Sequence, residues 1–192
     1  MILDTFRLIL LFLISIPCLS LKAQDIRFED IPLQWSDFKS AKSFGSRHAM
    51  AHVSYALEYQ MHSKENILDY TTNFRILPLK SWVDHEKLRK QSPENQERLL
   101  NHERGHLVIG LIYYQELQSA FQEEDFQGNV KRQMRKVFNR IYRKMRRFNK
   151  RYDKKTEHGV SAAAQRVWQK RLLKTLNTHY DIHSLQTTLQ SQ

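Results

Sequence analysis

The sequence has little cysteine, glycine or proline, and each shortage excludes a class of protein. Its 192 residues include one Cys, 5 Gly and 4 Pro. A single thiol can form neither an intramolecular disulfide framework nor a zinc site made of thiolates alone. The few Gly and Pro, together with 41% hydrophobic residues, exclude collagen-like and low-complexity chains. We therefore expect a globular chain of single-domain length with enough apolar residues for a core.

Long hydrophobic runs are also scarce, apart from one near the N-terminus. Residues 8–17 are almost all apolar, Arg7 precedes them, and the small residue Ala23 follows. This order of a basic, an apolar and a small-residue region is typical of a secretory signal peptide. The run is too short to predict a membrane span. We expect residues 1–23 to be a signal peptide, residues 24–192 to form one domain, and the protein to be exported, either to the periplasm or as a secreted protein.

Cleavage after Ala23 would also remove the single thiol. This residue, Cys18, invites a lipid anchor, but Pro17 before it is a poor fit to the small residue that a lipoprotein signal normally has there. The mature chain would then carry no cysteine.

Acidic residues are outnumbered, but the excess of positive charge is confined to one segment. The chain has 31 Lys and Arg against 20 Asp and Glu, a net charge of +11. Residues 131–155 alone have a net charge of +12, whereas the rest of the expected mature chain sums to −2. Apolar residues recur there every three or four positions, which predicts a helix with an apolar stripe and a basic outer face. Such a face suits an anionic envelope polymer or lipid, and export argues against nucleic acid as a partner.

Two stretches upstream alternate between apolar and polar residues, as half-buried strands do. They run from Val53 to Met61 and from Tyr70 to Ile76, with a polar stretch between them. We expect them to form an antiparallel hairpin over about residues 50–77. A short helical turn is expected near Trp35, and the tail after His183 is expected to be frayed.

The middle of the chain contains a motif with metal chemistry. Ser92 and Pro93 suit the start of a helix, which we expect to run over about residues 93–121. Within it stands His102-Glu103-x-x-His106. Histidines four residues apart lie on the same helix face, so both can bind one zinc ion. Glu103 can then reach a metal-bound water and act as the general base.

A catalytic zinc ion usually has three protein ligands, and the motif supplies two. The candidates for the third ligand include three glutamates further along the chain, Glu116, Glu123 and Glu124. Asp153 and His158 are the other candidates, at the end of the basic helix. Residue chemistry places His158 first, because a ligand after a break between helices can fold back onto the motif helix.

Five blocks of the chain stand out: Trp35-Ser36-Asp37-Phe38, Ser81-Trp82-Val83, Leu99-Leu100-x-His102-Glu103-x-x-His106, Tyr152-Asp153-x-x-Thr156-x-His158-Gly159 and Gln165-x-x-Trp168. Together they resemble a bacterial family of predicted secreted zinc-dependent proteases whose physiological role is undefined. The resemblance implies a zincin-like fold with His102 and His106 as zinc ligands and Glu103 as the catalytic base. It also favours His158 over the glutamates as the third ligand.

The sequence thus predicts an α+β, zincin-like domain in which the hairpin packs on the motif helix and two C-terminal helices. The expected function is an exported zinc metallopeptidase acting on a peptide or protein substrate. Tyr152 is a candidate oxyanion donor or, equally, the last apolar residue of the basic helix's stripe. Two alternatives remain: a non-catalytic, zinc-stabilised envelope protein, and a cationic module that binds anionic surfaces through residues 131–155. The sequence does not indicate an oligomeric state.

Overall fold

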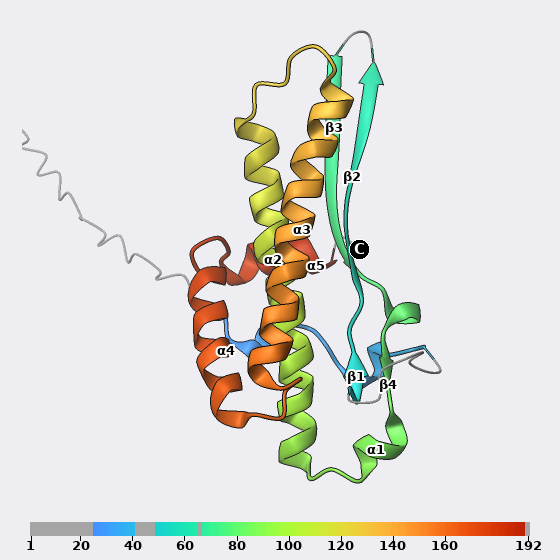
Figure 1. Ribbon diagram of the computed structural model, residues 1–192, viewed down its shortest axis with the longest axis vertical. Coiled ribbons are helices and arrows are strands. Elements are labelled where there is room, and N and C mark those ends of the chain that lie inside the picture. Colours follow the sequence, from blue (N-terminus) through green and yellow to red (C-terminus); the bar gives the residue numbers. More distant parts are fainter. Residues whose placement is uncertain (1–24, 41–48, 65–66, 191–192) are drawn as a thin grey trace, which may run out of the picture.

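The computed structural model describes residues 25–40, 49–64 and 67–190. Two long antiparallel helices lie along its longest axis, with a β-hairpin beside them (Figure 1). The expected signal peptide and Cys18 lie outside the described residues. In the part of the chain that is described, no helix combines the length and hydropathy needed to cross a membrane.

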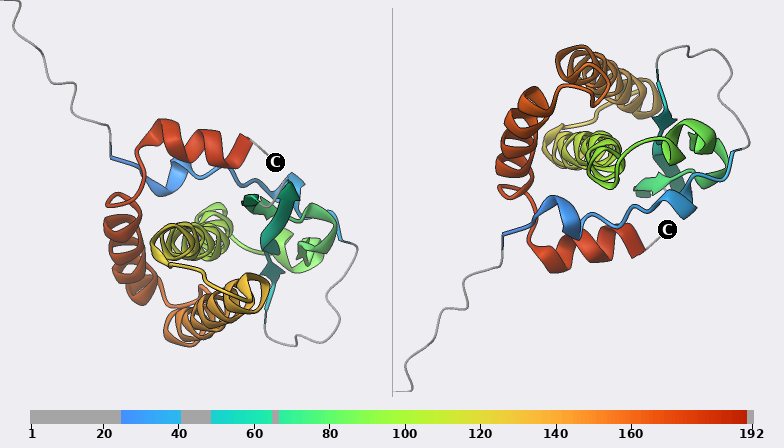
Figure 2. Two further views of the ribbon diagram at one scale, coloured as in Figure 1. Left: turned by 90° about the horizontal axis from the view of Figure 1, so that it is seen from above. Right: turned by 90° about the horizontal axis from the view of Figure 1, so that it is seen from below.

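The first long helix, α2, spans Pro93–Glu123 and contains the metal motif. Its start is as expected, since the Ser92 side chain accepts a hydrogen bond from the Asn95 backbone N–H, and Pro93 occupies the first helical turn. Viewed along the long axis, α2 occupies the centre and other elements surround it (Figure 2). A helix covered on most sides must be apolar around most of its circumference. Its central residues from Gly105 to Leu111 are accordingly all buried.

The basic helix, α3, spans Val130–Thr156 and runs back along α2. Its buried residues recur at steps of three, four or seven, which keeps them on one face, as the sequence predicts: Met134, Val137, Ile141, Met145, Tyr152 and Thr156. Its cations surround this stripe, and the expected amphipathic helix is confirmed. Among the described residues, one of these cations forms an ion pair, Lys144 with Glu116 at 2.7 Å.

Two further helices follow, α4 over Ala162–Leu176 and α5 over Ile182–Gln190. Helix α5 corrects two expectations, because the tail after His183 is helical and three helices, α3, α4 and α5, follow the motif helix instead of two. Asp181 and Ser184 cap its start, because each side chain accepts a hydrogen bond from the other's backbone N–H. Leu185 and Leu189, four residues apart, are buried against the core. A capped turn and two apolar anchors are enough to fix a short helix.

The expected hairpin is present as β2, Tyr55–Lys64, and β3, Ile67–Ile76. Tyr55 pairs with Ile76, and the buried residues Leu57 and Phe74 lie opposite each other. Phe74 faces α2, where Gly110 leaves room for its ring. The alternation of apolar residues therefore reports the face that packs on the motif helix.

A second, smaller sheet was not expected from the sequence. It pairs β1, Ala51–His52, with β4, Trp82–Val83, in antiparallel register. The connection includes a 3-10 turn, η3, over Pro78–Lys80, and a short helix, α1 (His85–Arg89), follows β4. Two further 3-10 turns, η1 (Phe28–Asp30) and η2 (Trp35–Asp37), lie upstream, and η2 is the helical turn expected near Trp35. The mixed α+β class is confirmed.

Candidate metal centre

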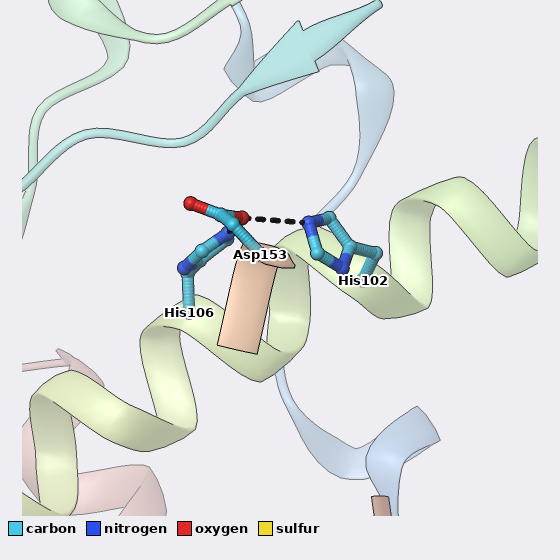
Figure 3. A group of neighbouring side chains, drawn as sticks. All are labelled: His102, His106 and Asp153. Carbon is cyan, nitrogen blue, oxygen red and sulfur yellow. Dashed lines mark hydrogen bonds and ion pairs between the residues drawn. The ribbon is translucent and has the colours of Figure 1, made fainter. Parts of the chain in front are cut away.

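Three side chains from two helices converge on one point. His102 and His106 lie one turn apart on α2, and Asp153 reaches them from the last turn of α3 (Figure 3). Asp153 Oδ1 is 3.2 Å from His102 Nε2 and 2.9 Å from His106 Nε2. One ligand atom from each residue lies within 4.8 Å of the other two. The histidine pair is therefore placed as the motif predicts, with a carboxylate as its neighbour.

A second layer of polar groups orients both imidazole rings. His106 Nδ1 is 2.6 Å from Asn149 Oδ1, and the Asn149 amide nitrogen donates to the Met145 carbonyl and the Tyr55 hydroxyl. His102 Nδ1 is 3.3 Å from Gln165 Oε1. An amide oxygen is an acceptor, so each Nδ1 donates to it, and Nε2 is the ring nitrogen that each histidine turns toward Asp153.

The ionisable groups of this arrangement shift each other's pKa. Burial raises the pKa of Asp153, but its contacts with His102 and His106 lower it more strongly, to well below its ordinary value. Burial lowers the pKa of His106, yet Asp153 and Glu103 together raise it to about 9. The raised pKa of His106 reports the negative charge of Asp153 and Glu103 beside it, and the lowered pKa of Asp153 reports stabilisation of its carboxylate by the two imidazoles. Two imidazole nitrogens and one carboxylate also match the donor set of catalytic zinc sites, which leave a position for water. The residues present therefore fit a zinc ion.

His158, the favoured third ligand from the sequence, lies at the edge of this cluster. Its Nδ1 is 3.6 Å from Asp153 Oδ1, and half of its side chain is exposed. The candidate that lies nearest to both histidines is instead the carboxylate of Asp153, which the sequence analysis ranked below His158. Glu123 and Glu124 follow His106 by at least 17 residues on or beyond α2, or about 25 Å at 1.5 Å per residue, and cannot reach the cluster.

Glu103 is buried beside the histidines, and all three residues line one cleft. Its Oε2 accepts a hydrogen bond of 2.7 Å from the backbone N–H of Val53, the residue that follows β1. A buried carboxylate needs such a partner, since leaving it without one costs several kcal/mol. The small β1–β4 sheet therefore holds the Glu103 carboxylate in place.

Tyr152 packs behind the histidines. Its ring stacks on His102 at 4.7 Å and meets His106 edge-on at 5.1 Å. Its hydroxyl donates to the His102 carbonyl and accepts from Gln165, and the side chain is fully buried. Both hydrogen-bonding directions of the hydroxyl are thus occupied inside the protein. This geometry favours the packing role of Tyr152 over the oxyanion role.

The turn after α3 explains the rest of the Tyr-Asp-x-x-Thr-x-His-Gly block. Thr156, which is fully buried, has its hydroxyl 3.3 Å from His102 Nδ1. The chain then adopts positive φ angles at Glu157, His158 and Gly159. Gly159 lies so close to His102 that a Cβ added to it would be 2.9 Å from the His102 Cβ. Arg98 donates to its carbonyl and ties the turn to α2.

Two clefts meet at the metal centre. One, of about 400 Å³, is lined by all three cluster residues together with Glu103 and His158. The other, of about 730 Å³, lies between β2 and α3 and includes His106 and Asp153 in its wall. His52 lines both clefts, and its partial desolvation lowers the pKa of its imidazole. Neither His52 nor Asn149 belongs to a motif with the histidine pair, so neither could be singled out from the sequence.

The close contact between Gly159 and His102 can be tested with an alanine substitution. We expect Gly159→Ala to lower both the melting temperature and the affinity for zinc, because the new Cβ displaces the His102 ring. Gly128→Ala is the matched control, since Gly128 also has a positive φ but has no atom within 4 Å of an added Cβ. It bears the backbone strain of about 1–2 kcal/mol without the clash. Equal zinc affinity in the two variants would contradict the assigned contact.

Comparison with known proteins identifies a family whose matched region contains the candidate metal centre. A family model described as a bacterial protein of unknown function, DUF922, matches residues 33–159. The match contains the histidine pair, Glu103 and Asp153, and it ends at Gly159. No curated protein and no solved structure matches the chain. Since the matched region covers well over half of the sequence, the chain belongs to the DUF922 family of bacterial proteins.

Proposed function

We propose that this protein is an exported zinc-dependent peptidase with a zincin-like active site. The observation that carries the proposal is the convergence of His102, His106 and Asp153 next to the buried Glu103, at the junction of two clefts. The zinc ligands are the Nε2 atoms of both histidines and the Asp153 carboxylate. Export rests on the signal-like N-terminus of the sequence.

When bound, zinc polarises a substrate carbonyl and lowers the pKa of a bound water to about 7. Glu103 takes the proton of the attacking water and returns it to the leaving amine. The Val53 N–H holds one of its oxygens and so keeps the carboxylate at the cleft. Asn149 and Gln165 hold the protons on the Nδ1 atoms and keep the histidine rings oriented.

His52 takes the oxyanion role for which Tyr152 was a candidate. It lines the same cleft as Glu103 and the three proposed zinc ligands, whereas the Tyr152 hydroxyl is buried behind His102. The lowered pKa of His52 favours the neutral ring, which still has one N–H to donate. We assign this N–H to the carbonyl oxygen of the substrate.

An open site supports catalysis over a purely structural zinc ion. Structural zinc sites are closed by four protein ligands, whereas catalytic sites keep one position for water. Here Asp153 is 29% exposed, and the clefts reach the cluster from two sides. Among the described residues, three come close enough together to ligate one ion.

Replacing Glu103 separates metal binding from catalysis. We expect Glu103→Gln to retain one zinc per chain and to lower kcat by about 100-fold or more, since it cannot accept the proton. Zinc content by mass spectrometry and hydrolysis of a quenched peptide library measure the two properties. Glu94→Gln, in the exposed first turn of α2, is the control that should leave both unchanged. If the wild-type protein binds zinc but cleaves no peptide, the non-catalytic alternative is favoured.

A second pair of variants identifies the third zinc ligand. We expect Asp153→Asn to weaken zinc binding by more than about 100-fold, because loss of even an orienting outer residue costs about 10- to 100-fold. His158→Ala should change the affinity by less than about tenfold, since its ring lies outside the cluster. Competition with a fluorescent chelator gives both dissociation constants. The opposite order of effects would establish His158 as the ligand.

The oxyanion assignment predicts a purely kinetic defect. His52→Ala should lower kcat by about 10²–10³ while zinc content and KM stay near the wild-type values. His62→Ala, which removes an exposed imidazole from β2, should have no effect on any of them. If Tyr152→Phe lowers kcat as much and His52→Ala does not, the role belongs to Tyr152.

A further inference from the structure

The larger cleft extends away from the metal centre between β2 and α3. Along α3 its wall runs from Asp153 back to Tyr142. These twelve residues span about 16 Å of helix, which is the length of about five residues of extended peptide. The cleft is therefore long enough to hold a stretch of chain on one side of a bond placed at the metal centre.

Positive charge concentrates in the wall of this cleft. Lys80 comes from the η3 turn, and Arg146 and Lys150 lie on α3. In the ranges that the structure describes, none of the three forms an ion pair with a carboxylate. A fourth cation of the wall, Arg75, is already bound to Glu58 at 3.0 Å.

Two of the unpaired cations lie at increasing distances from the metal centre along α3. On α3, Lys150 and Arg146 precede Asp153 by three and seven residues, or by about 4.5 and 10 Å along the helix axis. Those distances correspond to the first and third residues of an extended chain leaving the centre. Glu58 and Asp153 also line the cleft, but Glu58 is paired with Arg75, so the charges left unpaired away from the metal centre are positive and attract a negatively charged chain.

We propose that this cleft, here called the basic cleft, binds an acidic segment of the peptide substrate, with Asp or Glu side chains within about three residues of the scissile bond. Lys80, Arg146 and Lys150 are the residues that select it. The inference rests on the proposed peptidase function, because it assigns the substrate class of the same site.

Binding can be measured without turnover by using zinc-loaded Glu103→Gln protein. The probe is a fluorescein-labelled nonapeptide with Asp and Glu on one side of its central bond, and a second probe carries Asn and Gln instead. We expect the acidic probe to bind at least about tenfold more tightly by fluorescence anisotropy, and salt to reduce the difference. Replacing Lys80, Arg146 and Lys150 by Gln should abolish the preference.

The matched control is a triple Gln variant at Lys131, Lys136 and Arg140. It removes the same charges from the exposed part of α3 outside the basic cleft. This variant should keep the preference to within about twofold, because exposed charges at a distance are screened. An equal loss in both triple variants would overturn the proposal and indicate general attraction to a basic surface. Equal binding of both probes to the unsubstituted protein would overturn it as well.

Turnover separates this inference from the proposed function. If the wild-type protein cleaves neutral and acidic peptides equally well, the peptidase stands and the acidic preference is wrong. If the basic cleft binds the acidic probe selectively but the wild-type protein cleaves neither peptide, the cleft stands as a binding site and the peptidase proposal is wrong. Selective cleavage that the cleft variant loses supports both.

Discussion

The close packing of α3 against α2 at the metal motif is the constraint on which the rest of the site depends. Tyr152 lies on the imidazoles of His102 and His106, and its hydroxyl bonds to the His102 carbonyl. Gly105 permits this approach, because any side chain there would overlap the tyrosine ring. Because Tyr152 packs against both rings, the next residue of α3, Asp153, lies beside the Nε2 atoms of His102 and His106. A single helix contact thus completes the donor set.

The same contact explains why the site needs three helices. Orienting the ring of His102 requires Gln165 from α4, which also bonds to the Tyr152 hydroxyl. Orienting His106 requires Asn149 from α3, which is itself held by Tyr55 of β2. Each imidazole is therefore fixed from a different direction. Buried polar groups of this kind are stabilising when all are paired, and removal of one leaves the others unsatisfied.

Features that depend on local spacing could be predicted from the sequence, whereas those that depend on packing could not. The motif helix, the hairpin and the histidine pair follow from capping, alternation and i, i+4 spacing. The positions of Asp153 and His158 relative to the histidine pair do not, because they depend on the turn after α3. Positive φ angles from Glu157 to Gly159 leave His158 half exposed at the rim. Chemistry alone favoured an imidazole, but the packing presents a carboxylate.

The basic character of α3 has two separate consequences once its neighbours are known. Its net charge first suggests an anionic surface as partner, and most of its cations do face outward at the described surface. Arg146 and Lys150 differ from the others, because the helix turns them toward β2 and the metal centre. A cation in a cleft wall acts on a bound chain at short range, whereas the cations on the outer face act from a greater distance and are screened more strongly by salt. The helix that supplies Asp153 to the metal centre is therefore also placed to select the charge of the chain beside it.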